Sequence, residues 1–139
     1  KQTNNSFPIM LKFVSKDFKL ENNQNAIFRS GVEESLTENK YSLISEETQE
    51  ETLKEQSMQR NKECLDESCL VDTGKMLAAR GLFIIEVIKS KNDYLFKIKY
   101  INLETAETLK TKSLIYTKDI DNAQNLLDFA KELTKEVLK

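Results

Sequence analysis

The chain lacks histidine and tryptophan, and it has only three glycines and one proline among its 139 residues. Without histidine, the sequence excludes an imidazole base, an imidazole metal ligand and the Ser-His and Cys-His pairs of nucleophilic catalysis. Three scattered glycines provide no glycine-rich loop for a phosphate group. The longest apolar run, Gly81–Ile85, is far shorter than the ~20 residues that cross a bilayer. Composition therefore predicts neither an enzyme nor a cofactor site.

Charge of either sign is not in excess, because 21 Lys and Arg face 23 Asp and Glu for a net charge of −2. Nucleic-acid binding needs a surplus of basic residues on one surface, so this balance argues against it. The balance is uneven along the chain. Residues 46–72 hold nine acidic and three basic residues, whereas residues 73–118 hold four acidic and nine basic ones. Such charge runs usually serve solvation, which is the preferred interpretation, and the alternative is electrostatic steering of a partner or of head-to-tail self-association.

Apolar spacing alternates between the two-residue period of strands and the three-to-four-residue period of helices. It predicts strands at 7–14, 41–45, 82–89, 94–103 and 109–117, and helices at 22–39, 46–61, 69–80 and from 121 onward. The order β-α-β-α-α-β-β-β-α predicts an α/β sandwich with helices packed on one mixed sheet of about five strands. We expect one domain over 7–139, preceded by a flexible lead or tether at 1–6.

The helix predicted at 69–80 has a recognisable start and end. Asp66 or Ser68 can cap its first turn, and Gly81 stands where a glycine often follows a helix. Gly74 lies inside this helix, where glycine is unfavourable by roughly 1 kcal/mol relative to alanine. A close approach of the helix to the sheet is the expected reason.

Three later segments also carry specific signals. The continuous apolar run 82–85 predicts a central strand covered on both faces. The alternation at 94–100 predicts one covered and one solvated face. Asp121 followed by Gln124 resembles a capping box and predicts the start of the last helix.

The two cysteines, Cys64 and Cys69, are separated by four residues. An even number of cysteines at close spacing is consistent with an oxidising compartment. The first residue is Lys1 rather than methionine, which suggests a mature or trimmed chain whose targeting segment was removed. Together these features favour an exported protein.

The segment that contains both cysteines, CLDESCLVDTGKMLAA at 64–79, resembles the pattern C-x-x-x-x-C-A-x-x-x-G-K-x-L-G-A. An apolar strand at 82–87, a second strand at 94–101 and a turn at 102–107 follow, where the pattern ends in D-x-x-T-G-E. This order is similar to bacterial envelope proteins related to the curli-secretion lipoprotein CsgG and the TolB amino-terminal domain. Ala106 occupies the glycine position of that turn, so a different turn conformation is expected.

The resemblance implies a periplasmic or outer-membrane-associated interaction module without enzymatic activity. Relatives of this kind are assembly or regulatory parts of secretion channels, flagellar basal structures and cell-wall synthesis complexes, and many are lipoproteins. The implied partners are other envelope proteins, with self-association as a further expectation. Contact with a membrane is expected only through a lipid anchor upstream of Lys1.

Three alternatives exist for the cysteine pair. A structural disulfide between Cys64 and Cys69 is the preferred interpretation, and closing so small a ring is worth about 2 kcal/mol. A redox pair would use Cys69, since a helix N-terminus lowers a thiol pKa, although the nearby carboxylates oppose a thiolate. Two free thiols are the third interpretation. A zinc site with the neighbouring acids is disfavoured because zinc sites usually need more cysteine or histidine ligands.

Two sets of charged residues are candidates for an interaction surface. The acidic set lies at the start of a predicted helix, where carboxylates favour the helix dipole: Glu46, Glu47, Glu50 and Glu51. The basic set alternates on adjacent predicted strands: Lys97, Lys99, Lys110 and Lys112. Tyr94, Phe96 and Tyr100 have the opposite parity from Lys97 and Lys99, so we expect them in the core rather than stacked on nucleic-acid bases.

The sequence therefore predicts a non-catalytic protein-interaction module of the bacterial cell envelope. Two other functions are compatible with it. One is a surface lipoprotein that contacts host molecules, and the other is a thiol-disulfide redox protein that uses Cys64 and Cys69.

Overall fold

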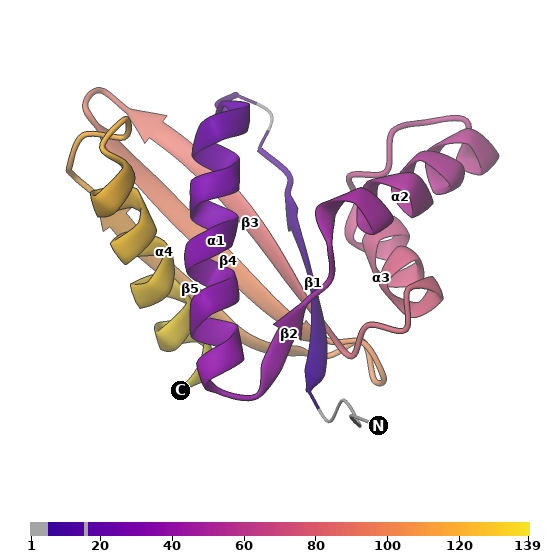
Figure 1. The fold of residues 1–139 in the computed structure, drawn as a ribbon. Helices are drawn as coiled ribbons and strands as arrows, with labels where there is room; N and C mark the ends of the chain where they lie inside the picture. The colour runs from indigo at the N-terminus through magenta and orange to yellow at the C-terminus, as the bar shows by residue number, and fades with distance from the viewer. Residues whose placement is uncertain (1–5, 16) are drawn as a thin grey trace.

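A computed structural model describes residues 6–15 and 17–139, so the predicted lead at 1–6 lies outside the described residues except for Ser6. Within these ranges the predicted order of strands and helices is confirmed (Figure 1). The elements are β1 (Phe7–Phe13), α1 (Asn22–Glu38), β2 (Tyr41–Leu43), α2 (Glu46–Arg60), α3 (Glu67–Met76), β3 (Gly81–Ser90), β4 (Asp93–Asn102), β5 (Thr108–Tyr116) and α4 (Ala123–Leu138).

The predicted mixed sheet is confirmed, with strand order β2-β1-β3-β4-β5. β1 runs parallel to both β2 and β3, whereas β4 is antiparallel to both β3 and β5. β2 is only three residues long and pairs with residues 7–9 of β1. It ends before the predicted boundary because the Ser45 side chain caps α2 by accepting a hydrogen bond from the Thr48 amide.

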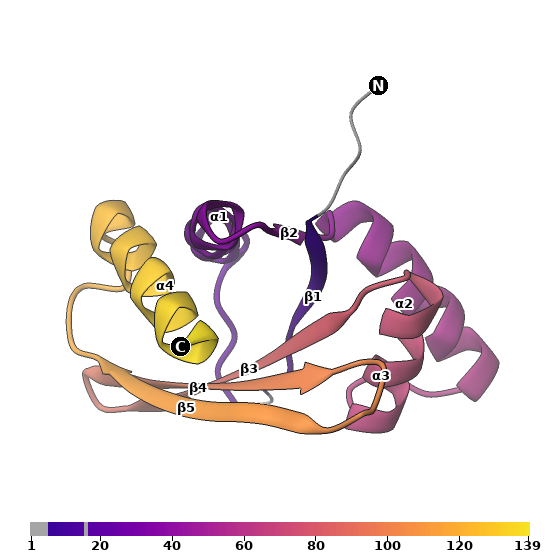
Figure 2. The same ribbon diagram turned by 90° about the horizontal axis from the view of Figure 1, so that it is seen from below.

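Helices α1 and α4 lie side by side over one face of the sheet, as Figure 2 shows. Their apolar sides and the facing strand residues form the main core, which includes Phe28, Phe83, Phe96 and Leu126, each fully buried. On the opposite face, α2 and α3 pack at one end of the sheet over a smaller core that contains Met10, Leu70, Leu82 and Ile101. No helix of residues 6–15 and 17–139 covers the rest of that face.

The central strand β3 is covered on both faces, as predicted. Leu82 and Phe83 are both fully buried, but they belong to the two different cores. The aromatic residues predicted to be internal on β4 are also buried, with exposures of 8% for Tyr94, 0% for Phe96 and 7% for Tyr100.

The predicted end of the helix at 69–80 is wrong. α3 ends at Met76, and Ala78, with φ of 58°, takes the left-handed conformation that was assigned to a glycine at position 81. Gly81 instead begins β3, where a Cβ atom would lie 2.6 Å from Ile9 Cδ1. The glycine is therefore required by packing between strands rather than by helix termination.

Three other glycine and capping predictions have different outcomes. Asp66 caps α3, as expected, by accepting a hydrogen bond from the Cys69 amide. Gly74 allows the close approach that was predicted, because a Cβ there would lie 2.6 Å from Leu103 Cδ1. The cap of the last helix is Asn122 rather than Asp121, whose carboxylate accepts a hydrogen bond from Gln24 instead.

The turn between β4 and β5 keeps a left-handed residue although glycine is absent. Ala106 has φ of 64°, which contradicts the expected change of turn conformation. Its amide donates to the Asn102 carbonyl at 2.7 Å, while the Asn102 side chain accepts from the amides of Glu104 and Thr105. These hydrogen bonds hold the turn against the strain of a Cβ at positive φ.

Candidate interaction surfaces

Cys64 and Cys69 form a disulfide, as the preferred interpretation predicted. Both residues are buried, with exposures of 3% and 0%. Their sulfur atoms are bonded to each other, so they are not thiolate ligands for zinc. Among the described residues, no cluster of three or more His, Cys, Asp or Glu residues could hold a metal ion. Burial also shields the pair from an attacking thiol, which disfavours the redox interpretation.

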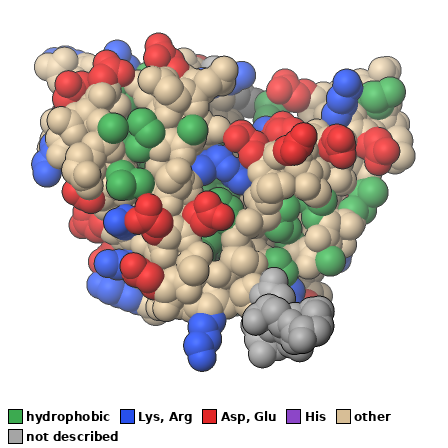
Figure 3. All heavy atoms as spheres, viewed as in Figure 1, with side chains coloured by type: hydrophobic (Ala, Val, Ile, Leu, Met, Phe, Trp, Pro, Cys, Tyr) green, Lys and Arg blue, Asp and Glu red, His purple; other side chains and the backbone are tan. Residues whose placement is uncertain are grey.

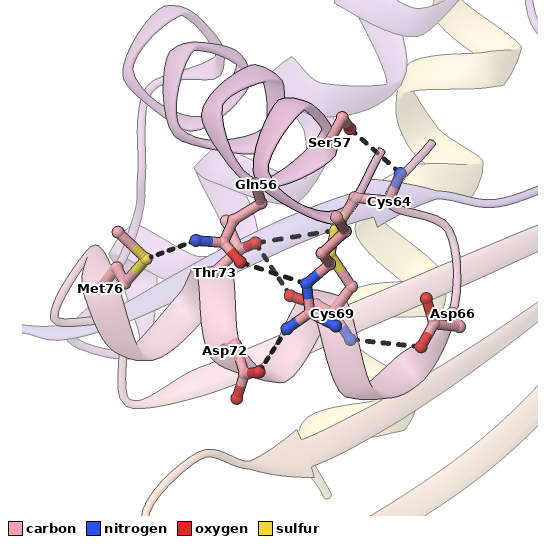
Figure 4. The surroundings of a disulfide bond; sticks show 9 residues. Gln56, Ser57, Cys64, Asp66, Cys69, Asp72, Thr73 and Met76 are labelled. Carbon is pink, nitrogen blue, oxygen red and sulfur yellow. Dashed lines mark hydrogen bonds and ion pairs between the residues drawn. A yellow bond between two sulfur atoms is a disulfide. The ribbon is translucent and has the colours of Figure 1, made fainter. Parts of the chain in front are cut away.

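The disulfide lies where α2, α3 and their connecting loop meet (Figure 4). The Cys64 amide donates to Ser57 Oγ on α2 at 3.1 Å, and the Thr73 hydroxyl donates to the Cys69 carbonyl at 2.9 Å. An ion pair between Arg60 and Asp72 also joins the two helices. The bond therefore stabilises the helix pair on the smaller core.

The four carboxylates of the predicted acidic set do not form one outward surface. Glu46 accepts a hydrogen bond from Asn25 at 3.0 Å, and Glu50 forms an ion pair with Lys12 at 3.4 Å. Both therefore face α1 and β1. Glu47 and Glu51 are exposed on α2, and Figure 3 shows acidic side chains gathered over that helix.

Two buried polar residues close the sheet edge behind these carboxylates. The Gln49 side chain donates to the Leu11 carbonyl at 2.6 Å and accepts from the Leu11 amide at 3.4 Å, as a neighbouring strand would. Arg29 donates to the carbonyls of Leu11 and Ile44 at 3.3 and 3.0 Å. Burial lowers the pKa of the Arg29 guanidinium, and the carboxylate of Glu46 opposes this shift.

Sequence patterns did not single out Arg29 or Gln49. A signal for Gln49 exists, since Gln49, Leu53 and Gln56 follow helical spacing in a segment that is otherwise highly charged. All three are buried, with exposures of 1%, 5% and 7%. The helix predicted at 46–61 therefore has a defined internal side.

The four lysines of the predicted basic set lie on two different faces of the sheet. Lys110 and Lys112 pair with Tyr100 and Ile98, so they share the face covered by α4. Lys112 forms an ion pair with Glu136 of α4 at 3.6 Å. Lys97 and Lys99 are on the opposite face.

The uncovered part of that opposite face, which we call the bare face, carries an apolar row across three strands. Ile88 of β3 pairs with Leu95 of β4, which pairs with Ile115 of β5. Ile88 is 46% exposed and Ile115 is 63% exposed. A row of large apolar side chains left in solvent is typical of a surface that binds another molecule.

The described elements define an open mixed α/β sheet with two helices over one face and two at the end of the other. No helix in the described part of the chain is long and apolar enough to cross a membrane. No protein-family model and no curated protein sequence matches the chain.

The same fold occurs in solved structures of bacterial envelope proteins. Lipoprotein GNA1162 from Neisseria meningitidis matches with a TM-score of 0.60 and 12% identity over 96% of this chain and 97% of that one. The LpoB C-terminal domain from Salmonella enterica matches with a TM-score of 0.58 and 12% identity over 81% and 84%. TolB from Acinetobacter baumannii matches with a TM-score of 0.57 and 6% identity over 98% of this chain and 29% of that one.

These likenesses establish an envelope-lipoprotein-like fold. They do not establish the narrower CsgG and TolB amino-terminal family that the sequence segment at 64–79 resembles, because identities of 6 to 12% show the fold alone.

Proposed function

We propose that this chain is a non-catalytic, exported interaction module of the bacterial cell envelope that binds other envelope proteins. The bare face is the observation that carries the proposal, because it leaves Ile88 and Ile115 in solvent on an otherwise well-packed sheet. The Cys64–Cys69 disulfide supports an oxidising location. The likeness of the fold to that of GNA1162 and LpoB supports a place among envelope lipoproteins.

Exposed charged residues of both signs support a role in steering that binding. Glu47 and Glu51 are exposed on α2, and Lys97 lies exposed on the bare face. Lys99, beside it, is held by Glu67 at 3.0 Å. The proposal includes the electrostatic attraction of a partner, or of a second copy, to these opposite charges. Association that does not weaken with added salt contradicts this part.

Fractionation of the bacterium that makes this protein tests location and redox state together. We expect the chain in the envelope fraction, with cysteines that react with a maleimide reagent only after reduction and unfolding. A photo-crosslinking residue at position 115 should form adducts with envelope proteins, whereas one at the exposed position 59 serves as the control. A cytosolic chain with two free thiols would overturn the proposal.

A further inference from the structure

Strand β5 forms one edge of the sheet, and its outward backbone groups can be identified from the ladder. The Ile85 carbonyl accepts a hydrogen bond from β1 at 2.9 Å, so the backbone of Ile85 faces away from β4. Its partner Ile98 therefore directs its own amide and carbonyl to β5, where it pairs with Lys112. By alternation, the amides and carbonyls of Thr111 and Ser113 point outward from the sheet.

We propose that β5 is a docking strand, to which an extended segment of a partner protein adds as a sixth, antiparallel strand. This inference rests on the proposed protein-binding function and assigns part of that binding to the edge of β5, beside the bare face. The outward backbone groups of Thr111, Ser113 and Ile115 supply the hydrogen bonds. β5 is nine residues long, and no further strand pairs with it in the described part of the chain. Main-chain pairing provides affinity in this mode of recognition, and side-chain pockets provide specificity.

A groove of about 200 Å³ lies beside the end of β5, between that strand and α4. Leu114, Tyr116 and Phe129 supply apolar surface to it, and Asp128 and Glu132 also line it. Side chains of an added strand stand directly opposite those of β5 on each face. The residue opposite Leu114 therefore stands at this groove, where an apolar side chain can contact Leu114 and Phe129.

Charge on the same face specifies the rest of the partner segment. Lys110 and Lys112 lie on the α4 side of β5, each about one-half or less exposed. Acidic residues opposite these lysines in an added strand form favourable cross-strand charge pairs. A second copy of β5 is a poor occupant, because antiparallel self-pairing brings these lysines toward the same lysines of the other copy.

The partner segment thus has an apolar residue followed by two acidic residues at alternate positions. In the antiparallel direction this order runs from its N-terminus to its C-terminus, opposite Leu114, Lys112 and Lys110 in turn. Threonines at the intervening positions face Ser113 and Thr111 and make the main-chain hydrogen bonds. The acidic residues on the groove disfavour an acid at the apolar position.

The probe is the capped peptide Thr-Leu-Thr-Glu-Thr-Glu-Thr, titrated to millimolar concentration against the whole chain and followed by amide chemical shifts. We expect saturable shifts concentrated at 109–116 and at the facing residues of α4. A peptide with lysine in place of both glutamates should bind at least about tenfold more weakly, by the loss and reversal of two cross-strand charge pairs. N-methylation of the two threonines that flank the first glutamate should abolish binding.

The matched protein variants are Ser113→Pro and Ser113→Ala. Proline removes the outward amide without removing a hydrogen bond to β4, so it should abolish peptide binding, whereas alanine should bind within about twofold of the parent. Lys112→Glu tests the pairing of charges across β5. Lys97→Glu, on the bare face, makes the same change of charge away from β5 and serves as its control. The N-methylated peptide makes the same test on the parent chain if the proline variant does not fold.

Three outcomes overturn the docking strand. They are no shift at β5 at millimolar peptide, equal binding of the glutamate and lysine peptides, and concentration-dependent β5 shifts without peptide, which would indicate pairing between copies. None of these outcomes changes the location or the redox state of the chain. Failure of the proposed function appears instead as a cytosolic, reduced protein.

Discussion

The two edges of the sheet are built in opposite ways. At one edge, β2 covers only residues 7–9 of β1, and the side chains of Gln49 and Arg29 satisfy the next exposed position, Leu11. At the other edge, β5 is nine residues long, and its outward backbone groups are unshared by another strand of the described chain. At one edge, the part of β1 beyond β2 is closed by side chains of the chain itself, and at the other the edge strand is left open.

This difference shows how a small sheet restricts where another chain can pair with it. Unpaired strand edges promote unwanted association, and proteins usually block them. Here a buried amide and a guanidinium perform that task at the edge near α2, where both are held by helices. At β5 the protection that the described residues provide is charge, from Lys110 and Lys112, which excludes like-charged strands and admits acidic ones.

The largest expected effect comes from opening the closed edge at Arg29. Arg29→Met leaves the Ile44 carbonyl without this hydrogen-bond donor and removes one of the donors to the Leu11 carbonyl. We therefore expect a loss of about 3 kcal/mol in unfolding free energy. Urea denaturation measures it. Arg80→Met, at an exposed arginine, should lose less than about 1 kcal/mol. Equal losses in the two variants would contradict the role given to Arg29.

Gln49→Leu tests the same edge through its other residue. Leucine fills a similar volume but leaves the buried Leu11 amide unpaired, so we expect a loss of about 2 kcal/mol. Gln59 is exposed on the same helix, and Gln59→Leu should change stability by less than about 0.5 kcal/mol. Denaturation curves of the two variants that coincide would remove the proposed strand-like role of Gln49.

Removal of the disulfide should weaken the closed edge indirectly, because Cys64 and Cys69 hold the helix pair that supplies Gln49. For Cys64→Ala/Cys69→Ala we expect a loss of about 2 kcal/mol with the sheet still folded. The chain treated with a reducing agent should show a similar loss. A variant that fails to fold, or one as stable as the parent, would show that this small ring has a different role.

The smallest effect concerns the turn that leads into the open edge. Ala106 has φ of 64°, so Ala106→Gly should stabilise the chain by about 1 kcal/mol. Thermal unfolding measures the gain. Ala26→Gly, at an exposed position in α1, should instead destabilise by roughly 1 kcal/mol. Loss of stability at position 106 would mean that the left-handed turn is wrong.

Local patterns predicted the order of the elements, the disulfide, and which side of β4 faces the core. The residues on that side are Tyr94, Phe96 and Tyr100. Hydrophobic periodicity and chain proximity carry this information directly. They do not indicate which polar side chain pairs with a distant strand. Arg29 and Gln49 therefore escaped prediction, since their hydrogen bonds to Leu11 span 18 and 38 residues.

The division of the lysines escaped prediction for a different reason. The register at Ile101 and Thr108, if continued, would place Lys110 opposite Lys99 on the bare face. An irregularity between Tyr100 and Ile101 shifts the pairing by one residue, so Lys110 lies opposite Tyr100 instead. A one-residue shift moves every following side chain to the other face, and no local pattern shows where such a shift occurs.

Amide hydrogen exchange, resolved by residue, tests the contrast between the edges most directly. The Leu11 amide should exchange as slowly as amides of the central strand β3, because Gln49 accepts its hydrogen bond. On β5, the amides of Lys112 and Leu114 should be protected and those of Thr111 and Ser113 should exchange rapidly. Rapid exchange at Leu11, or equal protection along the whole of β5, would contradict a sheet with one closed and one open edge.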